Sequence, residues 1–498
     1  MKKQFILAID QGTTGTRAFL FDQKGSIVAS AYKEFKQYFP KPGWVEHDAE
    51  EIWKSCTDVI KSVLHKSKIF PNQIAAIGIT NQRETTVLWD RKTSQPIARA
   101  IVWQCRRTSD MCQKLSRHSR LFRQKTGLVV DPYFSGTKIK WYFDNIKGLR
   151  QSALKGEICF GTIDSWLIWK LTGGKAHVTD MTNASRTLLF NIRTLKWDKE
   201  LIKILNIPPA IFPSVQNSGS IFGYTESLGK GRDRSLPSGV PIASVLGDQQ
   251  AALYGQGCYE AGTIKNTYGT GCFLVLNTGK KLILSKRGLL STIASDIDGK
   301  PIYAMEGSIF IAGAVVQWLR DQLAVIGKSS DTEKKIKGLN DTEGVYFVPA
   351  FTGLGAPYWD DQARGIICGL TRGAHAGHIT RAALESIAYQ TKDVFDIMKL
   401  ELGRNIRSLK VDGGACQNNF LMQFQADLLG CNIIRPKNVD STVLGAAQLA
   451  GVTIGLWNKK DMLRLQNPES VFKPKMNKKI RKKLYSGWLA AVSKVQEK

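Results

Sequence analysis

The feature that most constrains the fold is a loop of glycine and threonine, residues 11–16, that lies between two short apolar segments. The run over residues 5–9 is typical of a buried strand, and residues 18–21 form a second strand that ends in a turn. The loop is therefore predicted to be the tip of a β-hairpin, and it has no long helix behind it, unlike a P-loop or a dinucleotide-binding fingerprint. Small residues let backbone N–H groups approach an anion, and threonine hydroxyls add donors. Taken alone, the segment fits a phosphate-binding tip and an ordinary hydroxyl-rich hairpin equally well.

Related elements occur twice more in the second half of the chain. Residues 264–276 repeat the order of strand, Gly/Thr tip and strand, and residues 409–411 form a strand that runs into a Gly-Gly turn and a helix capped by Asn418. Backbone donors and a helix N-terminus both favour anionic phosphates. Asp10, at the end of the first strand, is suited to a phosphate-bound metal ion. Three such elements in this order predict two similar domains that close on one nucleotide.

The length of 498 residues is too great for one hydrophobic core and suggests two large domains. The first half alternates strands with amphipathic helices, which is typical of an α/β protein. A stretch rich in proline, serine and glycine, residues 208–239, reads as irregular connections, and the second half restarts with its own hairpin at Ile264. We therefore predict an α/β fold with one domain over residues 1–257 and a second over residues 258–498.

Composition excludes some classes of protein. No apolar run approaches the roughly 18 residues that a membrane span needs, so we expect no membrane insertion. The nine cysteines are scattered and form no CxxC pair, which is typical of reduced thiols in a cytoplasmic protein. The net charge of +28 would suit a nucleic-acid binder, but no zinc spacing, RNP aromatic pattern or basic zipper is present. A basic surface that helps to attract anionic substrates is the better account, and no nucleic-acid partner is expected.

Two candidates for chemistry stand near strand ends. Phosphoryl transfer needs an anion cradle, a metal ion, a base near the acceptor and polar anchors for that acceptor. Asp248 follows the apolar segment 245–247 and precedes a glutamine-rich helix start, so it could be the base or, equally, a helix N-cap. Arg83 and Glu84 follow the predicted strand 74–79. They could form hydrogen bonds with the donors and acceptors of a small polyol, or they could form an exposed salt bridge. His375 and His378 have no acidic partner at ligand spacing, so no metal site is expected there.

At this point the motifs resemble those of a known family, the FGGY carbohydrate kinases of the actin/RNase H-like ATPase superfamily, and the resemblance runs over nearly the whole chain. Within that family the chain is most similar to the members that phosphorylate glycerol. The motifs that carry the resemblance are residues 10–14 (DQGTT), 41–48 (KPGWVEHD), 81–86 (NQRETT), 103–108 (WQCRRT), 131–138 (DPYFSGTK), 247–250 (GDQQ), 352–359 (TGLGAPYW) and 365–385. The resemblance implies two RNase H-like domains with the nucleotide and the substrate in the cleft between them.

The resemblance also implies a reaction, the direct in-line transfer of a phosphoryl group from ATP to glycerol to give sn-glycerol 3-phosphate in glycerol catabolism, with Asp248 as the general base. Mg²⁺ would be held by Asp10, and the protein would be a cytoplasmic homo-oligomer, a dimer or a tetramer. The residues expected to hydrogen-bond glycerol are Arg83, Glu84, Tyr133, Asp248 and Gln249, with Trp103 and Phe273 packed against its carbon atoms. Those expected to bind ATP or ADP are Thr13, Thr14, Gly15, Arg17 and Thr270 at the phosphates, and Gly313, Gln317, Gly414 and Asn418 around the rest of the nucleotide.

One stretch departs from the family's pattern. Residues 229–239 are only partly similar to the Gly/Arg loop with which some bacterial members bind fructose 1,6-bisphosphate, and no histidine lies near them for control by phosphorylation.

Three rival functions stay open: another FGGY kinase that acts on a pentulose or similar polyol, an actin-like nucleotide-binding protein without small-molecule turnover, and a basic nucleic-acid binder. Arg83, Glu84 and Asp248 together argue against the actin-like protein, since a filament needs no acceptor site.

Overall fold

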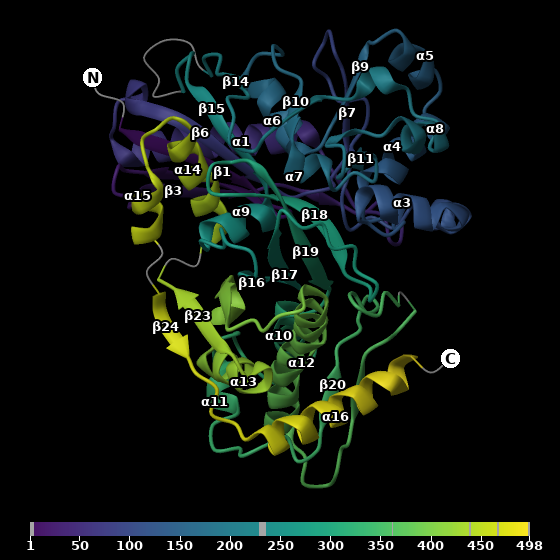
Figure 1. The fold of residues 1–498 in the computed structure, drawn as a ribbon, viewed down its shortest axis with the longest axis vertical. Coiled ribbons are helices and arrows are strands. Elements are labelled where there is room, and N and C mark those ends of the chain that lie inside the picture. Colours follow the sequence, from purple (N-terminus) through teal and green to yellow (C-terminus); the bar gives the residue numbers. More distant parts are fainter. Residues whose placement is uncertain (1–3, 229–235, 361, 438–439, 466–467, 497–498) are drawn as a thin grey trace.

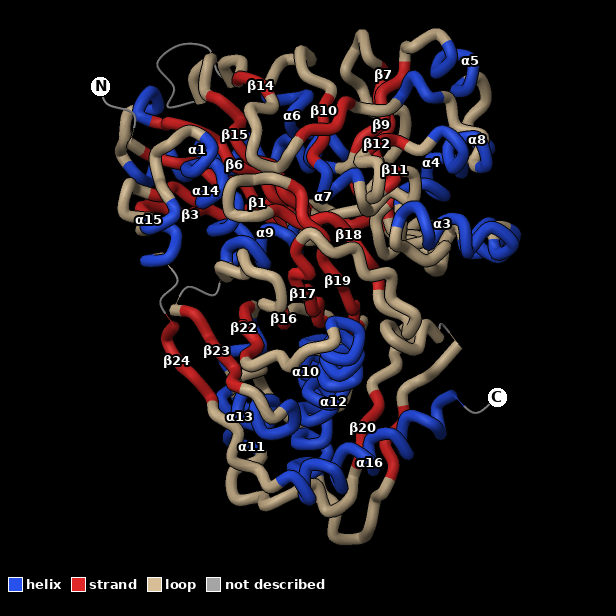
Figure 2. The backbone as a smooth tube through the Cα atoms, in the orientation of Figure 1, coloured by secondary structure: helices blue, strands red, loops and turns tan. Residues whose placement is uncertain are grey.

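Two β-sheets, one from each half of the chain, form the frame of the molecule (Figure 1). The fold is that of a computed structural model, which describes residues 4–228, 236–360, 362–437, 440–465 and 468–496. The first sheet lies in the upper body of Figure 1 and the second runs from its centre into the lower body. The helices lie on the faces of both sheets (Figure 2), as expected for the predicted α/β class.

The first sheet has six strands in the order β14-β15-β6-β1-β2-β3. Strands β1 and β2 pair antiparallel as the predicted hairpin, and β1 pairs parallel with β6, which in turn pairs parallel with β15. The buried central strands read as continuous apolar runs because both faces of the sheet are covered. The strands are β14 (Gly223–Tyr224), β15 (Pro241–Gly247), β6 (Ile74–Asn81), β1 (Phe5–Gln11), β2 (Gly15–Phe21) and β3 (Ile27–Glu34).

The second sheet has seven strands in the order β18-β19-β17-β16-β22-β23-β24 and repeats this pattern. Its β16 and β17 form the second predicted hairpin, and β16 pairs parallel with β22. Both hairpins predicted from the sequence are thus confirmed. The strands are β16 (Ile264–Tyr268), β17 (Cys272–Gly279), β18 (Leu290–Ser295), β19 (Pro301–Ile309), β22 (Ser408–Asp412), β23 (Asn432–Pro436) and β24 (Pro468–Phe472).

Alternate residues of the first sheet enter two different cores. Leu7 and Ile9 of β1 pack with helices α1 (Ala49–Ser67) and α6 (Ile163–Leu171), whereas Ile6 and Ala8 pack with α14 (Ser441–Thr453). Helix α1 begins where the sequence predicts, because the Asp48 carboxylate accepts the amides of Glu50 and Glu51. On the second sheet, one face packs against α10 (Gly313–Asp321), α12 (Ala376–Leu402) and α13 (Asn419–Leu429), and α16 (Lys478–Gln496) joins the same core through its contact with α13.

Helix α14 comes from the second half of the chain but covers the first sheet. Figure 1 shows this late segment, with α15 (Lys459–Arg464), among the elements of the upper body. Small residues allow the close packing: a Cβ on Gly78 of β6 would clash with the Ala446 carbonyl, and one on Gly445 would clash with the Ala251 carbonyl. The division at residues 257 and 258 stays a prediction, but the structure shows that the later part of the chain crosses back to the first sheet.

Helix α9 (Asp248–Gly255) lies between the two sheets. It begins directly after β15 of the first sheet, and its Leu253 packs with Val275 and Ala304 of the second. An outer lobe with a core of its own adjoins the first sheet and carries Trp103 and Tyr133. Its helices and short strands are β4 (Gln37–Tyr38), β5 (Glu46–His47), β7 (Val87–Asp90), β8 (Ala100–Ile101), α2 (Ser109–Lys114), α3 (Ser119–Thr126), α4 (Ser135–Asn145), α5 (Leu149–Leu154), β9 (Ile158–Gly161), β11 (Phe190–Asn191), β12 (Lys196–Trp197) and α8 (Lys199–Ile204). The short helix α7 (Met181–Ala184) lies beside the lobe and contacts β15 and β18.

The remaining short elements connect these parts. They are β10 (Val178–Asp180), β13 (Ser214–Gln216), α11 (Asp331–Lys335), β20 (Tyr346–Val348) and β21 (Ile366–Cys368). All nine cysteines are free thiols. Within the described ranges, no helix is both long and apolar enough to cross a membrane.

Candidate active site

A cavity of about 740 Å³ opens where the two halves of the chain meet. Its walls come from the ends of strands in both sheets and from the loops of the outer lobe. All the residues predicted to contact the acceptor line it: Arg83, Glu84, Trp103, Tyr133, Asp248, Gln249 and Phe273. Thr13 and Thr270, from the tips of the two hairpins, line it as well. The structure therefore brings the predicted acceptor residues and one threonine of each phosphate tip into one space.

A second cavity, of about 440 Å³, adjoins the first at the tip of the β16–β17 hairpin, because both cavities are lined by Gly269 and Thr270. It is lined by the residues predicted to surround the rest of the nucleotide, which are Gly313, Gln317, Gly414 and Asn418. Asn418 caps α13 by accepting the amide of Leu421, as the sequence predicts. The second cavity thus lies on a helix start and two glycine-rich turns.

Thr14, Gly15 and Arg17 of the first hairpin stand apart from these walls. Of the described residues, those that line the two cavities do not include these three. Arg17 lies on β2 and is about half exposed, with an ion pair of 3.2 Å to Asp440 at the start of α14. The structure therefore places Thr14 and Arg17 at the surface, whereas Gly15 is buried.

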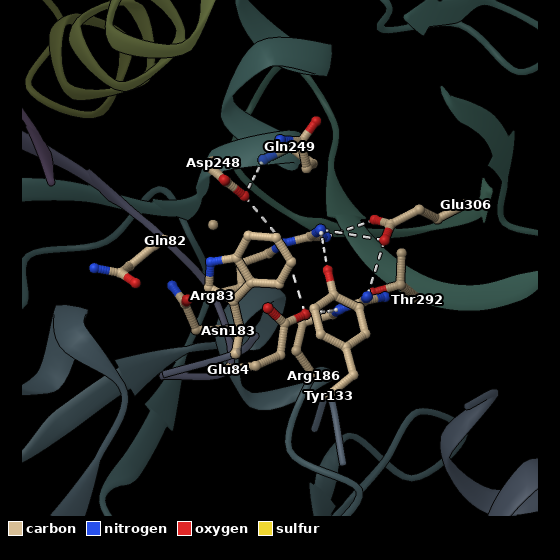
Figure 3. Close-up of polar contacts among 12 residues, drawn as sticks. Gln82, Arg83, Glu84, Tyr133, Asn183, Arg186, Asp248, Gln249, Thr292 and Glu306 are labelled. Atoms are coloured by element: carbon tan, nitrogen blue, oxygen red, sulfur yellow. Dashed lines mark hydrogen bonds and ion pairs between the residues drawn. The ribbon is translucent and has the colours of Figure 1, made fainter. Parts of the chain in front are cut away.

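The carboxylate of Asp248 faces the first cavity, which we call the acceptor cavity after the residues predicted to contact the acceptor. Gly247 holds the N-cap position of α9, and Asp248 is the first residue of the helix. Its Oδ1 accepts the Gln249 amide at 2.7 Å and lies 3.0 Å from the Arg83 Nε (Figure 3). Of the two roles open to Asp248 on the sequence, the N-cap is wrong, because Gly247 occupies that position.

Arg83 and Glu84 are both buried, so the alternative of an exposed salt bridge is also wrong. Glu84 has a φ of 62°, a left-handed conformation that is uncommon for a residue with a side chain. Three donors hold its carbonyl in this position, the Ser135 hydroxyl at 3.0 Å, the Thr86 hydroxyl at 3.1 Å and the Lys138 ammonium at 3.2 Å. Residues held in such strained conformations cluster at functional sites.

A network of buried charges supports this pair (Figure 3). Glu306 of β19 binds both terminal nitrogens of Arg83, at 2.5 and 3.1 Å, and the Nη2 of Arg186 at 2.9 Å. The Nε of Arg186 reaches Glu84 at 2.7 Å. Burial raises the pKa of Glu306, but the charges of Arg186 and Arg83 outweigh it and hold the pKa at about 2. Two arginines from the first half are therefore fixed by a carboxylate from the second.

Three aromatic rings complete the acceptor cavity. The ring centroids of Trp103 and Tyr133 lie 5.6 Å apart, and those of Trp103 and Phe273 lie 6.4 Å apart, both in edge-to-face arrangements. The indole N–H of Trp103 donates to the Thr13 hydroxyl at 2.9 Å. One side chain thus joins the apolar wall of the acceptor cavity to the tip of the first hairpin.

Comparison with known proteins identifies the family. The N-terminal domain model of the FGGY family of carbohydrate kinases matches residues 5–255, and its C-terminal domain model matches residues 264–454. The chain belongs to the FGGY family of carbohydrate kinases. The predicted family and the two-domain α/β fold are thereby confirmed.

Individual relatives of this FGGY kinase are similar over their whole length. The chain is 55% identical to the glycerol kinase of Caldanaerobacter subterraneus subsp. tengcongensis and 56% identical to that of Treponema denticola, with 99% of each chain covered in both cases. The crystal structure of Plasmodium falciparum glycerol kinase with ADP superposes with a TM-score of 0.92 at 38% identity, covering 100% of this chain and 99% of that one. A xylulose kinase from Lactobacillus acidophilus, with a TM-score of 0.86 at 22% identity over 98% of this chain and 97% of its own, shares the fold.

Asp10 is the candidate metal ligand of this FGGY kinase. Burial raises its pKa to about 7, Arg17 opposes the shift, and the carboxylates of Asp248 and Asp440 add to it. A cation beside Asp10 would therefore relieve an electrostatic cost that the protein alone leaves in place. Among the described residues no cluster of three or more metal-binding side chains exists. Mg²⁺ keeps several waters and is bound through one or two carboxylates together with substrate phosphates, so a single aspartate suits it.

Arg186 and Glu306 are the site residues that the sequence analysis missed. Glu306 is a single charged residue within β19, between Met305 and Gly307, and an isolated carboxylate in a buried strand was the signal that could have drawn attention to it. Arg186 follows the short helix α7 and is fully buried. Its partner Glu306 lies 120 residues away in the chain, so no local pattern marks it.

Proposed function

We propose that this FGGY kinase transfers a phosphoryl group from ATP to a terminal hydroxyl of glycerol and so forms sn-glycerol 3-phosphate. The observation that carries the proposal is the acceptor cavity, in which Arg83, Glu84, Asp248 and Gln249 surround a space walled by Trp103, Tyr133 and Phe273. The polar groups match the alternating donors and acceptors of a small polyol, and the rings match its carbon atoms. Relatives that are named glycerol kinase and match this chain over their full length support the same substrate.

In the proposed mechanism Asp248 is the general base. Its carboxylate is fixed by the Gln249 amide and by the Arg83 Nε, and about a third of the side chain stays exposed to the cavity, where it can take the proton of an incoming hydroxyl. Arg83 and Glu84 orient the acceptor so that its oxygen lies in line with the phosphoryl group. Because Thr13 accepts the Trp103 N–H, its own hydroxyl proton is free to be donated to a phosphate oxygen.

Magnesium and the nucleotide complete the proposal. Asp10 would hold Mg²⁺, through water, and the ion would neutralise charge on the phosphates. The nucleotide would span the two adjoining cavities, with its phosphates at Thr13 and Thr270 and its adenosine near Gly313, Gln317, Gly414 and Asn418.

The homo-oligomer and the cytoplasmic location stay predictions. Residues 229–235 of the departing loop lie outside the described residues, so control by fructose 1,6-bisphosphate stays open.

A substrate panel tests this function. ATP consumption is measured with glycerol, xylulose, ribulose and no acceptor, with Mg²⁺ present or removed by a chelator. We expect turnover that depends on both glycerol and Mg²⁺. Faster turnover with a pentulose would make the protein one of the other FGGY kinases, and ATP turnover that no acceptor changes would favour an actin-like nucleotide-binding protein.

A further inference from the structure

A lysine behind the wall of the acceptor cavity has no part in the mechanism above. Lys265 lies on β16 and is fully buried. Its ammonium donates to the side-chain Oε1 of Gln249 and, at 2.7 Å, to the Thr267 hydroxyl. Both partners line the acceptor cavity. Lys265 is thus one layer away from the substrate and touches two residues that face it.

The charges around Lys265 keep it protonated near neutral pH. Burial lowers the pKa of Lys265 to about 8, although the carboxylates of Asp412, Asp248 and Glu306 oppose this shift and Arg83 adds to it. An ammonium group has three donors and no acceptor. Only the oxygen of the Gln249 amide can therefore face Lys265, and the NH₂ group on the other branch of the same planar amide is directed away from it.

This geometry gives Gln249 a single orientation. A free glutamine amide can turn over and present either an acceptor or a donor to a ligand, because its two ends have almost the same shape. We propose that Lys265 is a positioning residue, which holds the carbonyl end of Gln249 so that the amide NH₂ is presented to an oxygen of the acceptor. The inference rests on the proposed function, since it assigns to that cavity a fixed hydrogen-bond donor for a hydroxyl.

A purely structural role is the competing explanation. A buried lysine among three carboxylates could serve only to balance their charge, and its loss would then lower stability without a selective effect on one substrate. The two roles differ in what they predict for KM. If Lys265 positions Gln249, removing the Lys265 ammonium raises the KM for the acceptor and leaves the KM for ATP unchanged.

The test uses Lys265→Met, which keeps most of the length of the side chain but has no N–H donor. We expect the KM for glycerol to rise about ten- to a hundredfold, the range for a buried hydrogen bond left unmade, with the KM for ATP within about twofold. Lys410→Met is the matched control, because Lys410 is the register partner of Lys265 on the neighbouring strand and donates to the carbonyls of Gln256 and Gly257 instead. It should leave the KM for glycerol unchanged.

A double variant separates the two explanations. If Lys265 acts through Gln249, the KM for glycerol of Lys265→Met combined with Gln249→Met should equal that of Gln249→Met alone. Independent, additive effects would overturn the proposal, as would an unmoved KM for glycerol or an equal rise in both KM values in Lys265→Met.

A second variant covers the case in which Lys265→Met does not fold. Gln249→Glu keeps the pairing with Lys265 but has no N–H to offer, so it should also raise the KM for glycerol, and a wild-type value would overturn the proposal. Wild-type protein that does not phosphorylate glycerol would instead refute the proposed function, and this outcome is read from the substrate panel before any variant is made.

Discussion

The acceptor end and the nucleotide end of the cleft are built in different ways. At the acceptor end, Arg83, Glu84, Arg186 and Glu306 are each no more than 2% exposed and bind one another. At the nucleotide end, the tips of the hairpins carry small residues, and Thr14, Gly269 and Thr270 are exposed. The charged groups of the first region pair with one another, whereas the second offers backbone and hydroxyl groups whose partner would be the nucleotide.

In the proposed function, this difference would divide specificity from affinity. Buried charged groups hold one geometry, and leaving one of them unpaired is costly, so the acceptor end would discriminate among small molecules by the position of each donor and acceptor. Phosphates need little more than backbone donors and positive potential. Substitutions at the two ends should therefore have effects of different kind and size.

The largest effect should follow Asp248→Asn. Asparagine keeps the shape and most hydrogen bonds of the carboxylate but cannot take the proton, so we expect kcat to fall by about 10²–10⁴ with little change in the binding of glycerol. Steady-state kinetics and calorimetric titration with glycerol measure the two quantities. Turnover close to that of the wild type would show that Asp248 is not the base.

Glu306→Ala should damage the acceptor end through stability. It leaves Arg83 and Arg186 buried without their shared carboxylate, and breaking a buried pair in this way costs about 3–5 kcal/mol. Chemical denaturation measures the loss. Asp321→Ala is the control in the same half of the chain, because it breaks an ion pair to Arg320 that lies at the surface, and it should change the midpoint little. Equal effects of the two substitutions would contradict the contrast between buried and exposed charges.

Local sequence patterns reveal the turns and helix caps of the nucleotide end but not the charge network of the acceptor end, for a physical reason. A hairpin tip or a capped helix is determined by residues that are neighbours in the chain, as at residues 11–16 and at Asn418. Local sequence patterns therefore reveal it. The charge network joins residues far apart, since Glu306 lies 223 positions from Arg83, and only the tertiary fold brings them together. The crossing of α14 to the first sheet was missed for the same reason, although its small residues Gly445, Ala446 and Ala447 are a signal of close packing.

Two glycines at the nucleotide end should sharpen the comparison. A Cβ on Gly313 would lie 2.5 Å from the Gly269 carbonyl oxygen, whereas one on Gly414 would meet no atom of the protein within 4 Å. Gly313→Ala should therefore lower both stability and affinity for ATP. Gly414→Ala should leave the melting temperature in place and raise the KM for ATP roughly five- to a hundredfold, the range for a methyl group forced into a filled site. An unmoved KM for ATP in Gly414→Ala would place the nucleotide elsewhere.

The smallest effect should follow Arg17→Ala, at the exposed end of the phosphate site. Arg17 is about half exposed, and its pair with Asp440 contributes little to stability, so unfolding should not change measurably. The KM for ATP should rise about two- to fivefold, which is what an exposed charged contact of up to ~1 kcal/mol allows. Because such a contact is screened by salt, the difference from the wild type should shrink as ionic strength rises, and Arg17→Lys should restore most of the affinity.

Asp440→Asn is the control that removes the ion pair but keeps the arginine, and it should not raise the KM for ATP. A rise in Asp440→Asn as large as in Arg17→Ala would mean that Arg17 acts by anchoring α14 to the first hairpin rather than by meeting a phosphate.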